Sequence, residues 1–167
     1  MFLIKLYKEG KLQIVEPSNI LCESYLKKSD SHFHSAKILL ESKKLEESAS
    51  MAYYGMYHSL IALMFRCGIK SENHSASIFL LESLFKEELL AKEITFGKKE
   101  RIDKQYYTDF KINERDCKDM ITKAEHFILQ IKNIIKNINQ HEIIELKSDL
   151  NRILNFYNKK RPKQFFL

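Results

Sequence analysis

Apolar residues recur at intervals of three and four along most of this chain, which is the spacing of one buried face of an α-helix. The first predicted helix begins near Pro17 and Ser18 and continues to about Lys43. Proline has no backbone N–H to leave unpaired in the first turn, and a serine hydroxyl caps the free amides there. The pattern therefore predicts a helix of several turns after a short lead-in.

The second predicted helix, over residues 45–67, has the broadest apolar face and is expected to lie at the centre of the fold. Gly68 follows it in the position where a positive φ ends many helices. A third helix is predicted after Asn73 or Ser75, either of which is a capping residue.

Helical periodicity weakens over residues 91–112, which contain Gly97 and a dense cluster of charges, and this predicts a short helix followed by a loop. It returns at Asn113 and Asp116, both in capping positions, and continues to Ile138. A further amphipathic stretch follows, and whether a break over residues 139–141 separates the two is left open by the pattern.

Three parts of the chain are distinguished on this basis. Residues 1–16 are a lead-in, whose alternating Phe2, Ile4 and Leu6 would also suit a strand or an arm. Residues 17–138 form the helical bundle, and residues 139–167 form a C-terminal amphipathic helix with a basic tail.

Composition supports long helices and few turns. The 167 residues include only 4 Gly and 2 Pro, too few for the frequent tight turns of a β-rich fold. The prediction is an all-α protein, a four- to five-helix up-and-down bundle.

The chain carries 28 Lys and Arg against 22 Asp and Glu, a net charge of +6, and part of the excess lies in the tail at Lys159, Lys160 and Arg161. Such a tail either contacts nucleic-acid phosphates or is a solvated end. Three widely spaced cysteines without a C-x-x-C motif fit a reducing compartment. With neither a secretory signal nor a membrane-length apolar run, we expect a cytoplasmic protein with no membrane partner.

Several sequence blocks, taken in order, resemble the HEPN family. The central-helix run Ala52-Tyr53-Tyr54-Gly55-Met56-Tyr57-His58 is similar to the tyrosine- and histidine-bearing helix of small prokaryotic HEPN proteins. The run from Gly68 to His74 resembles the family's connection into its third helix. Arg101 followed by Tyr106-Tyr107-Thr108-Asp109-Phe110 resembles its arginine motif region, and Ala124 and Phe127 lie where the family often has an alanine–aromatic patch.

This resemblance implies a HEPN-type bundle that forms a homodimer and partners a minimal nucleotidyltransferase, often as a toxin–antitoxin or defence module. Many members are metal-independent ribonucleases whose motif is an arginine, four to six residues, and a histidine. The histidine moves the 2′-hydroxyl proton and the arginine stabilises charge on the phosphate. In some relatives a tyrosine near the motif receives AMP, and Tyr106 or Tyr107 occupies that place here.

The motif histidine is absent, because Tyr106 and Tyr107 follow Arg101 where it should stand, and a tyrosine is a poor general base at neutral pH. The candidates for catalysis are Arg101, Asp103, Tyr106 and His58. The candidates for RNA or nucleotide binding are Tyr53, Tyr57, His74, Tyr107, Lys159, Lys160 and Arg161. Each of the tyrosines and histidines would equally serve in packing or in capping a helix.

The expected function is therefore a toxin or partner component that binds RNA or nucleotide at a degenerate site. An active metal-independent endoribonuclease, completed by His58 or His74, is the first alternative, and a non-catalytic helical adaptor is the second. No cofactor is expected, because the four glycines form no phosphate-binding loop, and no metal site is expected, because His32 and His34 point to different sides of a helix.

Overall fold

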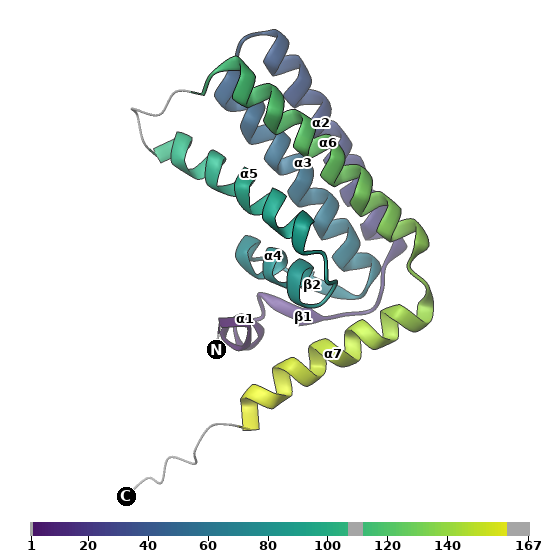
Figure 1. Cartoon of the computed structure of the whole chain (residues 1–167). Coiled ribbons are helices and arrows are strands. Elements are labelled where there is room, and N and C mark those ends of the chain that lie inside the picture. Colours follow the sequence, from purple (N-terminus) through teal and green to yellow (C-terminus); the bar gives the residue numbers. More distant parts are fainter. Residues whose placement is uncertain (1, 107–111, 160–167) are drawn as a thin grey trace, which may run out of the picture.

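The computed structural model describes residues 2–106 and 112–159, with the backbone alone for 101–106 and 156–159. Figure 1 shows a bundle of long helices with a small two-stranded sheet at one end. The elements in the described ranges are α1 (Phe2–Lys8), β1 (Leu12–Ile14), α2 (Asn19–Glu41), α3 (Leu45–Arg66), β2 (Ile69–Ser71), α4 (His74–Ser83), α5 (Glu88–Tyr106), α6 (Glu114–Asn137) and α7 (Gln140–Lys159). The all-α prediction is confirmed.

Helix α3 is the centre of the bundle, packed between α2, α6 and α5 (Figure 1). Small residues let α2 approach it closely: the buried Ser29 hydroxyl donates to the Gly55 carbonyl at 2.7 Å, and the Ser48 hydroxyl donates to the Ala36 carbonyl at 2.7 Å. A Cβ on Gly55 would lie only 3.4 Å from Phe33 Cβ and 3.4 Å from the Ser29 carbonyl oxygen, both on α2. The register between the two helices is therefore fixed by small side chains and buried hydrogen bonds.

The helix predicted in residues 91–112 is longer than expected, because α5 runs from Glu88 to Tyr106. Most of the loop predicted after it, residues 107–111, lies outside the described residues. Gly97 lies inside this helix as a packing residue. A Cβ there would meet Met120 Cε at 2.6 Å and Tyr53 Cδ2 at 3.4 Å. The glycine that suggested a break instead lets α5 lie against α3 and α6.

The strand alternative for Phe2, Ile4 and Leu6 is also wrong, since these residues belong to α1, which buries Leu3 and Leu6. The strand lies further along: β1 pairs antiparallel with β2, with Leu12 opposite Ser71 and Ile14 opposite Ile69. The beginning of the chain is thereby attached to the connection between α3 and α4.

The predicted helix ends are confirmed. Ser18 Oγ accepts from the Leu21 amide at 3.2 Å, Asn73 Oδ1 accepts from the Ala76 amide at 3.0 Å, and Gly68 follows α3 with φ +73°. Asn73, and not Ser75, is thus the cap of α4.

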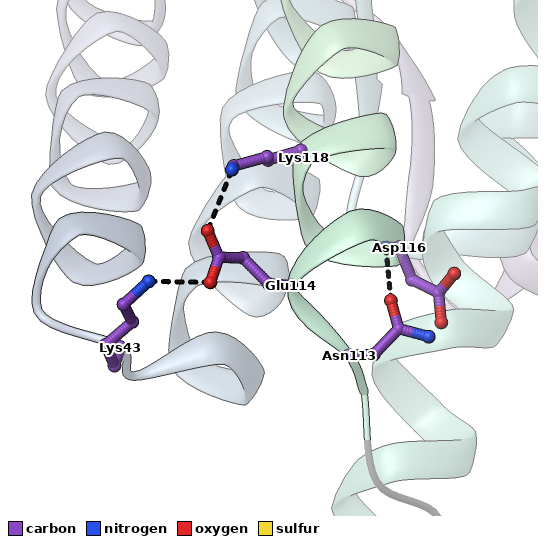
Figure 2. A network of polar contacts seen from close by, with 5 residues as sticks. All are labelled: Lys43, Asn113, Glu114, Asp116 and Lys118. Atoms are coloured by element: carbon purple, nitrogen blue, oxygen red, sulfur yellow. Dashed lines mark hydrogen bonds and ion pairs between the residues drawn. The ribbon is translucent and has the colours of Figure 1, made fainter.

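Figure 2 shows the start of α6, where Asn113 Oδ1 accepts from the Asp116 amide at 2.9 Å. Asn113 is the cap, and Asp116 lies in the first turn. Glu114 bridges Lys43 at 2.6 Å and Lys118 at 2.8 Å, and hydrogen bonds from Lys118 and Lys43 lower the pKa of Glu114 to about 2. This network holds the α2–α3 turn against the beginning of α6.

The break between the last two helices is real. Asn139 caps α7 reciprocally with Glu142: Asn139 Oδ1 accepts from the Glu142 amide at 3.0 Å, and Glu142 Oε2 accepts from the Asn139 amide at 2.8 Å. Helix α7 then turns away from the bundle and passes α1 (Figure 1). None of the helices within the described residues is both long enough and apolar enough to span a membrane.

Candidate functional site

Aromatic and imidazole rings gather where α2, α3, β2 and the first turn of α4 meet. The ring-bearing residues of this cluster are Tyr25, His32, Tyr53, Tyr54, Tyr57, His58, Phe65 and His74. Two rows of α3 supply half of them, because residues 53 and 57, and likewise 54 and 58, are one helical turn apart. We call this group the tyrosine–histidine cluster.

His74 is held firmly in the cluster. Its ring stacks on Tyr57 with centroids 3.6 Å apart and planes 10° apart, and its Nδ1 lies 2.6 Å from the buried Tyr53 hydroxyl. When that hydroxyl donates, the imidazole proton is on Nε2, which is then the donor nitrogen of the ring. Burial raises the pKa of the Tyr57 phenol, which therefore stays neutral beside it.

His58 is half-buried and stacks on His32 with centroids 4.8 Å apart. Its Nδ1 is buried and makes no hydrogen bond within the described part of the chain. Burial, with the positive charge of Lys28 and the neighbouring imidazoles, lowers the pKa of His58 to about 4. At neutral pH this side chain is therefore an uncharged imidazole with an unused polar atom.

A cavity of about 310 Å³ opens beside these rings. Its lining residues are Tyr25, Tyr57, His58, Ile61, Phe65, Lys70, Ser71, Glu72 and His74. The walls are thus mostly aromatic, whereas β2 and the residue after it supply a charged edge. There Lys70 Nζ and Glu72 Oε1 are 2.8 Å apart and partly exposed. The arrangement offers flat rings for stacking and one cation for a phosphate.

Four of the residues that the sequence singled out, Tyr53, Tyr57, His58 and His74, come together in the tyrosine–histidine cluster. Arg101, Asp103 and Tyr106 lie on the last turns of α5, where the structure describes no side chains. Tyr107, Lys160 and Arg161 lie outside the described residues, and Lys159 is the last residue of α7, with its side chain not described.

The backbone nevertheless brings the end of α5 near His74. Gly97 packs on Tyr53, which contacts His74, and Lys98 Nζ lies 2.5 Å from Ser75 Oγ. Arg101 follows one helical turn after Gly97. The arginine and the histidine are therefore on neighbouring elements, although they are 27 positions apart in the sequence.

Sequence reasoning missed Tyr25, His32, Lys70 and Glu72 as members of the site. Lys70 and Glu72 lie within four residues of His74 in the sequence, just before the capping Asn73. This closeness in the sequence could have indicated that they belong to the site. Nothing local signals Tyr25 and His32, because the register of α2 on α3 decides which of its residues reach the cavity. Within the described ranges no three histidine, cysteine or carboxylate side chains converge as metal ligands.

Comparison with known proteins gives one family match and two relatives. A family model described as the HEPN domain matches residues 22–135. A protein of Methanocaldococcus jannaschii named as a putative toxin is 29% identical over 115 residues, covering 66% of this chain and 85% of the relative. A UPF0332 protein of Pyrococcus horikoshii is 34% identical over 84 residues, covering 47% of this chain and 59% of the relative.

Proposed function

The chain belongs to the HEPN family, and from that premise we propose that it is a toxin-type member that binds single-stranded RNA or nucleotide in the cavity of the tyrosine–histidine cluster. The name of the archaeal relative supports the toxin role. The partner that we propose is a minimal nucleotidyltransferase, as the resemblance implies, together with a second copy of the chain.

One observation carries the binding proposal: the parallel Tyr57–His74 pair, fixed by Tyr53, lies at the wall of a cavity with Lys70 at its edge. Stacking of one base on such a ring contributes on the order of 1–3 kcal/mol to the binding free energy, and it does not require a particular base. The neutral His58 on the cavity wall suits a base better than a phosphate, because an uncharged ring can stack on a base and offers a phosphate no positive charge.

Binding is tested with a fluorescent single-stranded RNA of mixed sequence, titrated with wild-type protein and two variants. His74→Ala removes a stacked ring, and we expect the Kd to rise about 10-fold. Lys70→Gln removes the cation at the edge and is expected to weaken binding about 3-fold and to reduce its salt dependence. Lys11→Gln, on the paired strand region, is the matched control and should bind as wild type.

Equal affinities for all four proteins would contradict the proposal, provided that circular dichroism shows each variant folded. Complete absence of RNA affinity at low salt would instead favour the helical adaptor. Co-purification with a nucleotidyltransferase encoded beside this protein tests the partner separately.

The second candidate function is a metal-independent endoribonuclease, favoured by the nearness of the end of α5 to His74. In that reaction a histidine accepts the 2′-hydroxyl proton and Arg101 stabilises the charge on the phosphate. His58 is a weak base with a pKa of about 4, whereas His74 can accept the proton at Nε2 in the tautomer whose Nδ1–H donates to the Tyr53 hydroxyl.

Incubation with total RNA in EDTA separates the two functions. The binding proposal predicts intact RNA, whereas the ribonuclease predicts cleavage that both Arg101→Ala and His74→Ala abolish. His58→Ala is the comparison variant. If His58→Ala abolishes cleavage and His74→Ala does not, the proton transfer is assigned to His58 instead.

A further inference from the structure

The charged edge of the cavity in the tyrosine–histidine cluster contains a carboxylate beside its cation. Lys70 is the middle residue of β2 and Glu72 follows the strand, so their side chains leave the backbone on the same side, whereas Ser71 between them is buried. Both charged side chains line the cavity and are partly exposed. Alone, a carboxylate at this edge would repel the phosphates of a bound RNA.

Glu72 is an ionised acceptor that a ligand can reach. Its Oε1 lies 2.8 Å from Lys70 Nζ, and this is its one ion pair within the described part of the chain. A hydrogen bond from Lys70, together with the charges of Lys70 and Lys11, lowers the pKa of Glu72, so the carboxylate is charged at neutral pH. An ionised carboxylate has about four lone-pair sites. Lys70 occupies one of them, and 53% of the side chain is exposed, so the others are accessible to a ligand.

Two of the hydroxyl groups on the cavity wall are already engaged within the protein. Ser71 Oγ accepts from Ser77 Oγ at 2.9 Å and donates to the Asn73 carbonyl oxygen at 3.4 Å, and the Tyr57 hydroxyl is hydrogen-bonded to Ser77. Burial raises the pKa of the Tyr57 phenol, and the charge of Glu72 adds to this effect, as expected for a carboxylate that faces the same cavity. Among the residues that line this described cavity, Glu72 is the one carboxylate.

The ribose of RNA carries a donor that suits such an acceptor. Its 2′-hydroxyl is on the carbon next to the one that bears the 3′-phosphate, and a cation and an acceptor 2.8 Å apart present partners at a similarly close spacing. Building on the proposed RNA binding, we propose that Glu72 accepts a hydrogen bond from the 2′-hydroxyl of the bound nucleotide while Lys70 binds the adjacent 3′-phosphate. Glu72 then selects RNA over DNA at this cavity, because the 2′-hydroxyl is the group that DNA lacks.

The selection has two physical sources. With RNA, the hydroxyl proton satisfies a lone pair of the carboxylate that Lys70 leaves free, and a hydrogen bond to a charged group is stronger than one between neutral groups. With DNA, no donor is present at this position, and the carboxylate is brought close to a phosphate without compensation. The stacked rings bind either ligand, because every base has a π-face. Affinity for nucleic acid and preference for RNA are therefore separate properties of the site.

The test compares three fluorescent single-stranded oligonucleotides of identical base sequence, all with uracil in place of thymine. Their sugars are ribose, 2′-deoxyribose and 2′-fluororibose, of which the last keeps the sugar conformation of RNA but has no hydroxyl proton to donate. Titration with the full-length wild-type protein at about 0.1 M salt should give a Kd for RNA about 10-fold lower than for either of the others. The preference is thus expected to follow the hydroxyl and not the sugar conformation.

Two substitutions of Glu72 separate the acceptor from its charge. Glu72→Ala removes both, so the ratio of the Kd for DNA to the Kd for RNA should fall from about 10 to about 1, with the affinity for DNA unchanged or increased. Glu72→Gln keeps an acceptor oxygen without the charge and is expected to retain about a 3-fold preference. Glu9→Ala is the matched control, because Glu9 forms an ion pair with Lys11 at 2.9 Å but does not line the cavity. This control should keep the wild-type ratio.

Three results would overturn the proposal. They are equal affinity of the wild type for all three oligonucleotides, a preference for RNA that Glu72→Ala retains, and a folded Glu72→Ala variant that loses its affinity for DNA as well as for RNA. In each of them the wild type still binds RNA, so the proposed function stands. Absence of wild-type affinity for all three oligonucleotides is a different result, since it would contradict RNA binding itself.

Discussion

His58 shows at the scale of one residue how burial selects a protonation state. Its pKa of about 4 lies below the ordinary value of 6.5, so the unfolded chain binds a proton more readily than the folded one. The stability that results is fully present above about pH 6.5 and is lost as the pH falls towards 4. Allowing for the partial exposure of the ring, it amounts to on the order of 1–2 kcal/mol.

Replacing His58 with a residue that does not titrate should remove this part of the acid sensitivity. We expect the free energy of unfolding in urea to fall less between pH 7 and pH 4 for His58→Phe than for the wild type. His34→Phe changes an exposed histidine on α2 and should follow the wild-type curve. Parallel curves for wild type and His58→Phe would contradict the assigned pKa.

The individual residues of the site can be predicted from the sequence more easily than the contacts between them. Tyr53 and Tyr57 stand out through helical spacing, and His74 through its place beside the capping Asn73. The stacking of His58 on His32 depends on how α2 lies on α3, which the buried Ser29–Gly55 hydrogen bond fixes. Such a contact between helices leaves no periodic pattern in either one.

At the scale of elements, two helix ends have the same left-handed backbone with different residues. Gly68 has φ +73°, and a Cβ there would lie 2.6 Å from the Val15 carbonyl oxygen, whereas Lys86 has φ +63° without being a glycine. We therefore expect Gly68→Ala to lower the free energy of unfolding by about 2–4 kcal/mol, through backbone strain and the clash.

Lys86→Gly is the opposite change and should raise the free energy of unfolding by about 0.5–1 kcal/mol, because glycine adopts this φ without strain. Urea denaturation of both variants against the wild type measures the two effects. Destabilisation by Lys86→Gly would mean that the bond from Lys86 Nζ to the Ser83 carbonyl, or the entropy of the unfolded chain, outweighs the strain.

The Glu114 bridge is the second element-scale feature with a measurable effect. Its pKa of about 2 lies below the ordinary 4.5, so its contribution is present above about pH 4.5 and is lost as the pH falls towards 2. The difference in melting temperature between Glu114→Gln and the wild type should therefore be smaller at pH 3 than at pH 7. Because the carboxylate is exposed, 0.5 M salt should shrink the difference at pH 7. A difference that is unchanged with pH would contradict the bridge.

For the whole molecule, periodicity and capping residues were enough to predict the all-α class and the positions of α2, α3, α4 and α6. They failed where packing overrides local signals. Gly97 suggested a break and is instead the contact point of α5 with Tyr53 and Met120. The alternating Phe2, Ile4 and Leu6 suggested a strand, but burial of Leu3 and Leu6 against the core selects a helix.

The pairing of β1 with β2 has a kinetic consequence. It joins the beginning of the chain to the far side of the α2–α3 hairpin, so its formation closes a long loop, whereas α2 and α3 meet across a short turn. We expect the hairpin to form early and the small sheet to form late and open first. In hydrogen exchange, the paired amides of Val15 and Glu72 should then exchange faster than that of Leu60 in α3.

Lys70, Ser71 and Glu72 line the cavity. Separation of β1 from β2 would therefore also widen the entrance to the cavity. RNA bound there should slow exchange at Val15 and Glu72 and leave Leu60 unchanged. Equal protection of all three amides without ligand would mean that the sheet and the bundle unfold only together. If the sheet opens before the bundle, as we expect, access to the pocket is set by the rate at which β1 and β2 separate as well as by the affinity of the ligand.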